Sequence, residues 1–324
     1  MSSAIVPIPP RDLSRAGLQS LPAPIVNAGK RAAFRFVEFF TANIRNRNTR
    51  AAYAQAVMQF FTWCEKRGAV KLEQMNPVLI AAYIETHSAS APTVKQHLAA
   101  IRMLFDFLVT GQVVPVNPAS SVRGPKHVVK RGKTPVLSAQ EARTLIDSIK
   151  TDSIVGLRDR AIIGTMCYTF GRVSAMVHMR VEDYYQVGKR WWLRLHEKGG
   201  KRHEVPAHHN AEAYMDAYLD AADIRSETKS PLFRSLSNRR MITPNAMTRT
   251  DVLRMIKRRA AEAGLPSSTC CHTFRATGIT AYLENGGTIE NAQAIAAHES
   301  PRTTKLYDRT GDEITLDEVE RIAI

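Results

Sequence analysis

A segment rich in proline, glycine and basic residues separates two long stretches of helical pattern in this chain. It reads "VNPASSVRGPKHVVKRGKTP", spans residues 116–135 and contains no acidic residue. Proline and glycine break helices and mark loops, so the helical patterns on its two sides belong to different elements. The chain has 324 residues, which is more than one hydrophobic core usually serves. We therefore predict two domains joined by a basic linker.

The periodicity of apolar residues predicts a mainly α protein. Before residue 115, apolar residues recur at three- and four-residue spacing, and the alternation typical of strands does not occur. After the linker, "DYYQVGKRWWLRLHEKGGKRHEVPA" alternates and contains turn signals, which predicts three short antiparallel strands among further helices. The predicted parts are a loose N-terminal arm over 1–28, a helical bundle over 29–115, the linker over 116–135, an α+β domain with a small antiparallel sheet over 136–310, and a C-terminal helix over 311–324.

The charge balance predicts a polyanionic partner. The chain has 45 Lys and Arg against 30 Asp and Glu, a net charge of +15, and nucleic acid is the commonest polyanion. Two alternatives remain: the protein could be basic without a specific partner, and the charges of the linker could be only solvated. The residues that we predict to contact nucleic acid are Arg45, Arg47, Arg50, Lys95, Arg123, Lys126, Lys130, Arg131, Lys133 and Lys201.

The cysteines predict neither disulfides nor a metal site. Cys64 and Cys167 lie in apolar helical runs, and the pair Cys270-Cys271 precedes His272 without a second cluster at ligand spacing. So few cysteines suit a reducing cytoplasm. The N-terminus lacks the pattern of a signal peptide, and the apolar run "AIIGTMCYTF" is too short to span a bilayer.

Several basic residues have the spacing expected of a phosphate site. His272 and Arg275 are three residues apart at the start of a predicted helix, so both lie on one face near its positive end. Arg172 follows a helix break at Gly171 and could supply a second guanidinium fork. Lys198 occupies a Gly-Gly turn, from which a cation can reach a groove. Each feature is weak alone, because exposed basic residues are usually just solvated.

Taken in order, these features resemble the tyrosine recombinase (integrase) family over about residues 30–310. "GLRDRAIIGTMCYTFGRVSAMVHMRVEDY" resembles its first arginine box, "HEKGGKRHEVPAH" its lysine hairpin and "HTFRATGIT" its second box. "AIAAHESPRTTKLYDR" resembles its last box, in which His298 and Tyr307 stand nine residues apart. The resemblance implies a SAM-like core-binding domain before the linker and a catalytic domain after it. The catalytic residues that it implies are Arg172, Lys198, His272, Arg275, His298 and the nucleophile Tyr307.

The resemblance also implies a function. A site-specific recombinase of this family cleaves and rejoins DNA strands through a 3′-phosphotyrosine, without metal, cofactor or ATP. The implied assembly is a homotetramer on two double-stranded DNA sites with inverted repeats, held by exchange of the C-terminal helix, in the bacterial cytoplasm at the nucleoid. The alternative for that helix is packing on its own domain. The alternative functions are a type IB topoisomerase-like relaxing enzyme and a non-catalytic DNA-binding relative.

Two positions depart from the family's pattern. The family usually has Glu or Asp three residues after the first arginine, where this chain has Ala175. It also usually has Gly before the histidine of the last box, where this chain has Ala297. In the family this acid helps to hold the first arginine in place. We therefore expect both departures to affect the rate of the reaction more than its type.

Overall fold

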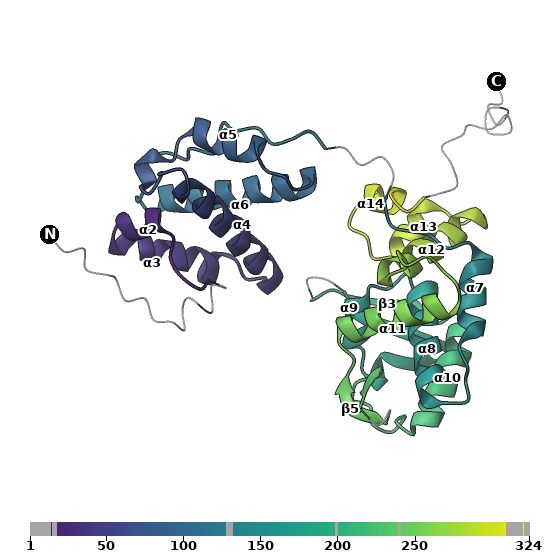
Figure 1. Cartoon of the computed structure of the whole chain (residues 1–324). Coiled ribbons are helices and arrows are strands. Elements are labelled where there is room, and N and C mark those ends of the chain that lie inside the picture. The colour runs from purple at the N-terminus through teal and green to yellow at the C-terminus, as the bar shows by residue number, and fades with distance from the viewer. Residues whose placement is uncertain are drawn as a thin grey trace. The chain divides into compact units, whose positions relative to one another are not determined.

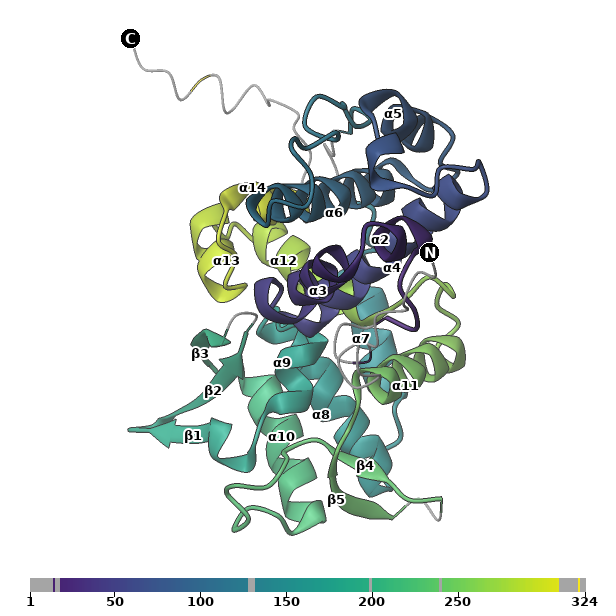
Figure 2. The ribbon, with the colours of Figure 1, turned by 90° about the vertical axis from the view of Figure 1, so that its left-hand side faces the viewer.

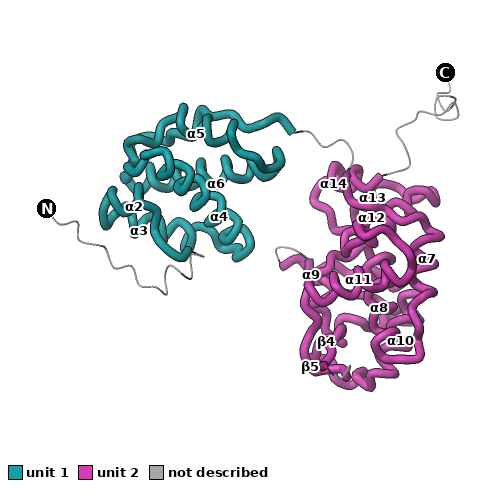
Figure 3. The backbone as a smooth tube through the Cα atoms, viewed as in Figure 1, with its two compact units in different colours: residues 1–128 teal, residues 129–324 magenta. Residues whose placement is uncertain are grey.

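The chain folds into two compact units, within residues 1–128 and 129–324 (Figures 1 and 3). The computed structural model describes residue 14, residues 18–127, 132–197, 200–238 and 241–308, and residue 320. Each unit has a hydrophobic core of its own. The predicted fold class, a helical bundle followed by an α+β domain, is confirmed.

The first unit is a helical bundle. Its elements are α2 (Ala23–Asn27), α3 (Lys30–Glu38) with the π-helical turn η1 (Phe39–Asn43), α4 (Arg47–Glu65), the 3-10 turn η2 (Leu72–Gln74), α5 (Pro77–Glu85) and α6 (Ala91–Thr110). Asn46 and Asn76 begin α4 and α5, because their side chains accept hydrogen bonds from backbone N–H groups of the first turn. The core is rich in aromatic rings: Phe36 lies edge-on to Phe40 at 5.3 Å and to Phe61 at 6.1 Å.

The bundle extends beyond the predicted 29–115 at both ends. The described end of the predicted N-terminal arm is not loose, because Leu18 and Ile25 are buried in the core of the bundle. Their apolar side chains are more stable there than in water. At the other end, Ala119 and Val122 of the predicted linker enter the same core, and Arg102 donates hydrogen bonds to both of their carbonyls.

The second unit is helical with two small sheets. Its helices are α7 (Ala139–Ser148), α8 (Ile154–Tyr168), α9 (Val173–His178), the 3-10 turn η3 (Val181–Asp183), α10 (His209–Ala222), α11 (Arg249–Glu262), α12 (Cys271–Glu284), α13 (Ile289–Ile295) and α14 (Pro301–Lys305). Its strands are β1 (Tyr184–Val187), β2 (Arg190–His196), β3 (Arg202–Pro206), β4 (Arg234–Leu236) and β5 (Ile242–Ala246).

The predicted antiparallel sheet is present in the order β1-β2-β3, which Figure 2 shows in teal. Leu193 of β2 stands opposite Tyr184 of β1 and Val205 of β3, so the buried face of the sheet is apolar. A second, two-stranded sheet of β4 and β5 was not predicted. Its strands are short, its register is irregular, and Pro244 interrupts the pattern of β5.

Close packing of α8 against α12 buries the residues of α12 that face α8. A Cβ atom at Gly278 would come within 2.1 Å of the carbonyl oxygen of Cys167, so only glycine permits this approach. The residues of α12 from Thr273 to Thr280 are buried as a result. Arg275 is one of them, and its guanidinium is therefore held inside the unit.

Candidate active site

Arg172 begins α9 as its N-cap residue. The sequence predicts a helix break at Gly171 just before it. In the structure α8 ends at Tyr168, and Arg172 lies in extended conformation before Val173. Its Nη1 donates to Oε2 of Glu197, which is the residue directly after β2. The side chain of Arg172 is 29% exposed and that of Glu197 only 4%. The first predicted arginine is therefore partly open to solvent and anchored on a buried carboxylate.

Arg275 lies in the first turns of α12 and is 1% exposed. Its Nη1 donates to the carbonyl oxygen of Phe170, and its Nη2 donates to that of Ala296 at 2.6 Å. Its buried Nε has no hydrogen-bond partner among the described residues. Burial, together with the positive charge of Arg172, lowers the pKa of Arg275 to about 10, and the nearby Tyr307 partly offsets this.

His298 and Tyr307 lie against each other. Their ring centroids are 5.6 Å apart and their planes differ by 13°. Nδ1 of His298 is 2.9 Å from Oγ1 of Thr304, and the side chain of Thr280 donates to the carbonyl oxygen of Tyr307 at 2.8 Å. Tyr307 lies in the turn directly after α14, which ends at Lys305. Burial, followed by the charges of the two arginines, lowers the pKa of His298 to about 3, so its ring is neutral at pH 7.

His272 lies in the first turn of α12 on its exposed side. Partial burial and the positive charges of Arg275 and Arg172 lower its pKa, so its neutral form is favoured at pH 7. The same two arginines act on both histidines, and Arg275 also interacts with Tyr307. Five of the six predicted catalytic residues are therefore gathered in one place.

Lys198, the sixth, lies outside the described residues. The residues that flank it close the hairpin between β2 and β3, because the backbone N–H of Glu197 donates to the carbonyl oxygen of Lys201 at 2.8 Å. Lys201, which the sequence assigns to nucleic acid, forms an exposed ion pair of 2.9 Å with Glu299. An exposed pair of this kind contributes little stability, so a phosphate group can replace Glu299 at small cost.

The other predicted nucleic-acid contacts differ in exposure. Arg50 is half-buried, and its Nε and Nη2 donate to the carbonyl oxygen of Ile44 at 3.0 and 2.8 Å, which supports the turn before α4. Lys130 and Arg131 lie outside the described residues. The exposed members of the set are Arg45, Arg47, Lys95, Arg123, Lys126 and Lys133.

The two departures from the family's pattern have structural consequences. Ala175 is buried in the core of the second unit, so no ionisable group of α9 lies behind Arg172 at that position. Ala297 has a φ of +47°, in the left-handed region that favours glycine. Glu197 is the residue of the site that sequence reasoning missed; its position next to the predicted lysine was the available signal.

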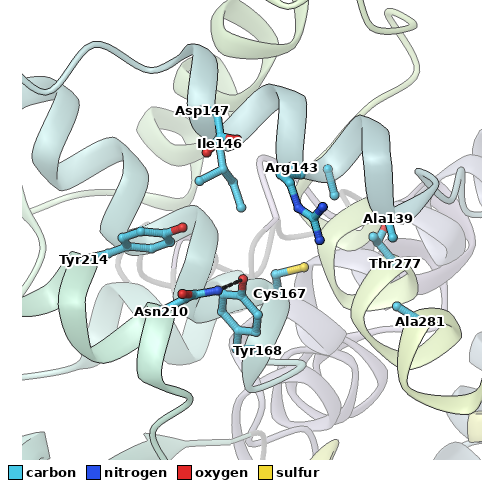
Figure 4. A pocket seen from close by; sticks show the side chains of 11 residues that line it. Ala139, Arg143, Ile146, Asp147, Cys167, Tyr168, Asn210, Tyr214, Thr277 and Ala281 are labelled. Carbon is cyan, nitrogen blue, oxygen red and sulfur yellow. Dashed lines mark hydrogen bonds between the residues drawn. The ribbon is translucent and has the colours of Figure 1, made fainter. Parts of the chain in front are cut away.

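A pocket of about 360 Å³ lies between α7, α8, α10 and α12 (Figure 4). None of the predicted catalytic residues lines it. The amide of Asn210 donates to the hydroxyl of Tyr168 at 3.0 Å on its wall. Cys167 also lines it, but burial raises the pKa of this thiol to about 12, so it is protonated and a poor nucleophile at pH 7.

The described residues contain no group of three or more His, Cys, Asp or Glu side chains that could hold a metal ion. No helix among them combines the length and the apolar character needed to cross a membrane.

Sequence profiles of two domains match the chain. The phage integrase family matches residues 135–313, and the SAM-like N-terminal domain of phage integrases matches residues 35–112. The first match alone covers more than half of the chain. This chain therefore belongs to the phage integrase family, the tyrosine recombinases.

Curated relatives agree with this assignment. The tyrosine recombinase XerD of Chlorobaculum tepidum is 29% identical over 271 residues, which cover 80% of this chain and 85% of the relative. The tyrosine recombinase XerC of Pelobacter propionicus is 29% identical over 265 residues, which cover 80% and 84%. The chain is a site-specific tyrosine recombinase and hence a DNA strand transferase. The alternatives of a topoisomerase-like enzyme and of a non-catalytic relative find no support in these comparisons.

Solved structures share the fold. The XerH site-specific recombinase bound to a palindromic difH substrate matches with a TM-score of 0.67 at 16% identity, over 99% of this chain and 90% of that one. A lambda integrase tetramer bound to a Holliday junction matches with a TM-score of 0.60 at 18% identity, over 87% and 79%.

Proposed function

We propose that Tyr307 is the nucleophile with which this recombinase cleaves DNA. The oxygen of Tyr307 attacks the scissile phosphorus, which gives a 3′-phosphotyrosine and a free 5′-hydroxyl. Because the ester keeps the energy of the broken bond, a second strand can be joined without ATP. The observation that carries the proposal is the gathering of two arginines and two neutral histidines around Tyr307.

The two arginines stabilise the charge of the transition state. Arg172 and Arg275 bind the non-bridging oxygens of the phosphate, where preorganised donors in a partly dry site are most effective. The Nε of Arg275, which has no hydrogen-bond partner among the described residues, offers a donor that is already desolvated. Neither this step nor the attack of Tyr307 requires a metal ion.

The histidines and the lysine handle protons. A free tyrosine has a pKa of about 10 and is a poor nucleophile at pH 7, so His272 in its neutral form assists as a general base. Nδ1 of His298 is in hydrogen-bond contact with Oγ1 of Thr304. When the hydroxyl is the donor in this contact, the proton of His298 is on Nε2, where it can be donated to a phosphate oxygen. Lys198 protonates the leaving 5′-oxygen.

Trapping of a covalent complex tests this function. A nicked double-stranded substrate, taken from inverted repeats in the DNA that flanks the gene, loses its short 5′-hydroxyl fragment after cleavage and leaves the protein attached. Peptide mapping of the denatured complex should locate the DNA on Tyr307. Attachment to another residue would contradict the proposal.

We further propose that the protein acts as a homotetramer on two such sites, in the bacterial cytoplasm at the nucleoid. The lambda integrase neighbour forms a tetramer on a Holliday junction. The sequence "TLDEVERIAI" after Tyr307 predicts a short helix, with a capping box of Thr315 and Glu318 and one apolar face. It lies outside the described residues except for Glu320. So short a helix needs its apolar face buried, and we assign that face to a neighbouring protomer.

Removal of residues 310–324 should leave binding to a single site largely intact and abolish pairing of two sites. The deletion removes the predicted exchange helix but none of the residues gathered around Tyr307. Gel-shift and sizing experiments with one and two sites measure the two properties. Paired complexes that form with the truncated protein would show that the helix packs on its own domain.

Alanine at the five basic residues of the linker should flatten the salt dependence of DNA binding. Each phosphate contact that is lost lowers the slope of log affinity against log salt by about 0.9. The five residues are Arg123, Lys126, Lys130, Arg131 and Lys133. A matched control replaces Lys189, Arg225 and Lys229, exposed basic residues outside the predicted set, and should change the slope little. An unchanged slope in the linker variant would mean that the linker is only solvated.

A further inference from the structure

The site around Tyr307 places two guanidinium groups near each other. The charge of Arg172 lowers the pKa of Arg275, which shows that the two groups repel. Arg275 is held by two backbone carbonyls inside the unit. Arg172 is partly exposed, and its side chain is long and flexible, so it needs a partner to keep one position.

Glu197 provides this partner from the hairpin. Its backbone N–H is bonded to the carbonyl oxygen of Lys201, and its side chain is 4% exposed and paired with Nη1 of Arg172. The charge of Glu197 also acts on Arg275 and opposes the loss of its proton. One buried carboxylate thus compensates both arginines.

No acid is available on α9 itself. The position three residues after Arg172 is Ala175, which is buried among the apolar residues of the core. We infer that Glu197 supplies from the β2–β3 hairpin the carboxylate that the chain lacks at Ala175, and that it is a positioning residue for Arg172. The inference rests on the proposed function, because Arg172 is positioned for the phosphate that Tyr307 attacks.

The geometry leaves Arg172 able to bind phosphate. Its contact with Glu197 uses Nη1, and among the described residues no side chain accepts a hydrogen bond from Nε or Nη2. The fork can therefore hold the carboxylate on one side and phosphate oxygens on the other. If the carboxylate only competed with the phosphate for Arg172, its removal would speed cleavage up. If it positions Arg172, its removal slows cleavage.

The test replaces Glu197 and measures single-turnover cleavage of the nicked substrate. We expect Glu197→Ala to slow cleavage by about 10²-fold, the loss that a displacement of about 1 Å in a reacting group produces. Glu197→Gln keeps an acceptor for Arg172 without the charge and should lose less. Glu204→Ala is the matched control, since Glu204 is an exposed acid of the same hairpin that pairs with Arg194 at 2.8 Å. Its cleavage rate should stay near that of the wild type.

A double-mutant cycle separates positioning from general damage. The Arg172→Lys variant already lacks the guanidinium group that Glu197 positions. In this background Glu197→Ala should slow cleavage by less than about 3-fold, because the effects of two substitutions that act through one contact are not additive. Thermal melts check that each variant is folded. A folded Glu197→Ala variant that cleaves as fast as the wild type, or an equal loss in both backgrounds, would overturn the inference. Wild-type protein that forms no covalent complex would instead overturn the proposed function, and the inference with it.

Discussion

Tyr307→Phe should abolish formation of the covalent protein–DNA complex and leave binding to the recombination site unchanged. The change removes only the nucleophilic oxygen. The ring that stacks on His298 remains, and so does the backbone carbonyl that accepts from Thr280. Denaturing gels of the nicked substrate measure the complex, and gel shifts measure binding.

Tyr282→Phe is the matched control for this prediction. Tyr282 is a partly buried tyrosine of the same region, and its ring lies 6.1 Å from that of Phe170. Loss of its hydroxyl should leave cleavage intact. A covalent complex that survives Tyr307→Phe would show that another residue is the nucleophile.

Arg172→Ala and Arg275→Ala should each slow cleavage by at least about 10²-fold, the effect of removing one donor to the charge of a transition state. Single-turnover rates on the nicked substrate measure this loss. Lysine at either position keeps the charge but not the fork, so it should recover only part of the rate. A near-normal cleavage rate in either alanine variant would show that the substituted arginine is not a catalytic residue.

Arg275→Ala also removes hydrogen bonds to two carbonyls, so its effect on stability has to be separated from its effect on rate. Arg234→Ala serves this purpose. Arg234 is a buried arginine of the same unit, and its guanidinium donates to Glu227 and to Ser230 rather than to residues near Tyr307. It should lower the melting temperature and keep the cleavage rate of the folded fraction.

The elements that the sequence predicts well are those with local causes. Alternation and turn residues predict the strands around Leu193, which the structure contains. Ser138 and Glu141, three residues apart in the sequence, form a capping box at the start of α7. Such features depend on neighbours within a few residues, so they are visible in the chain itself.

The elements that it misses depend on distant partners. Leu18 and Ile25 belong to the bundle only because a core is available to bury them. The strand β4 exists because β5 pairs with it, and neither is long enough to show a pattern alone. Ala297 adopts a positive φ, which alanine itself does not indicate.

For the site, the sequence by itself determined which residue types are present and in what order: two arginines, two histidines, a lysine and Tyr307, within boxes that resemble the recombinase family. Only the tertiary structure decided how they act on one another. The burial of Arg275 follows from the close approach of α8 and α12 at Gly278. The pairing of Arg172 with Glu197 joins residues on two elements whose contact no local pattern encodes. Electrostatic effects depend on distance and burial, which arise only when the chain has folded.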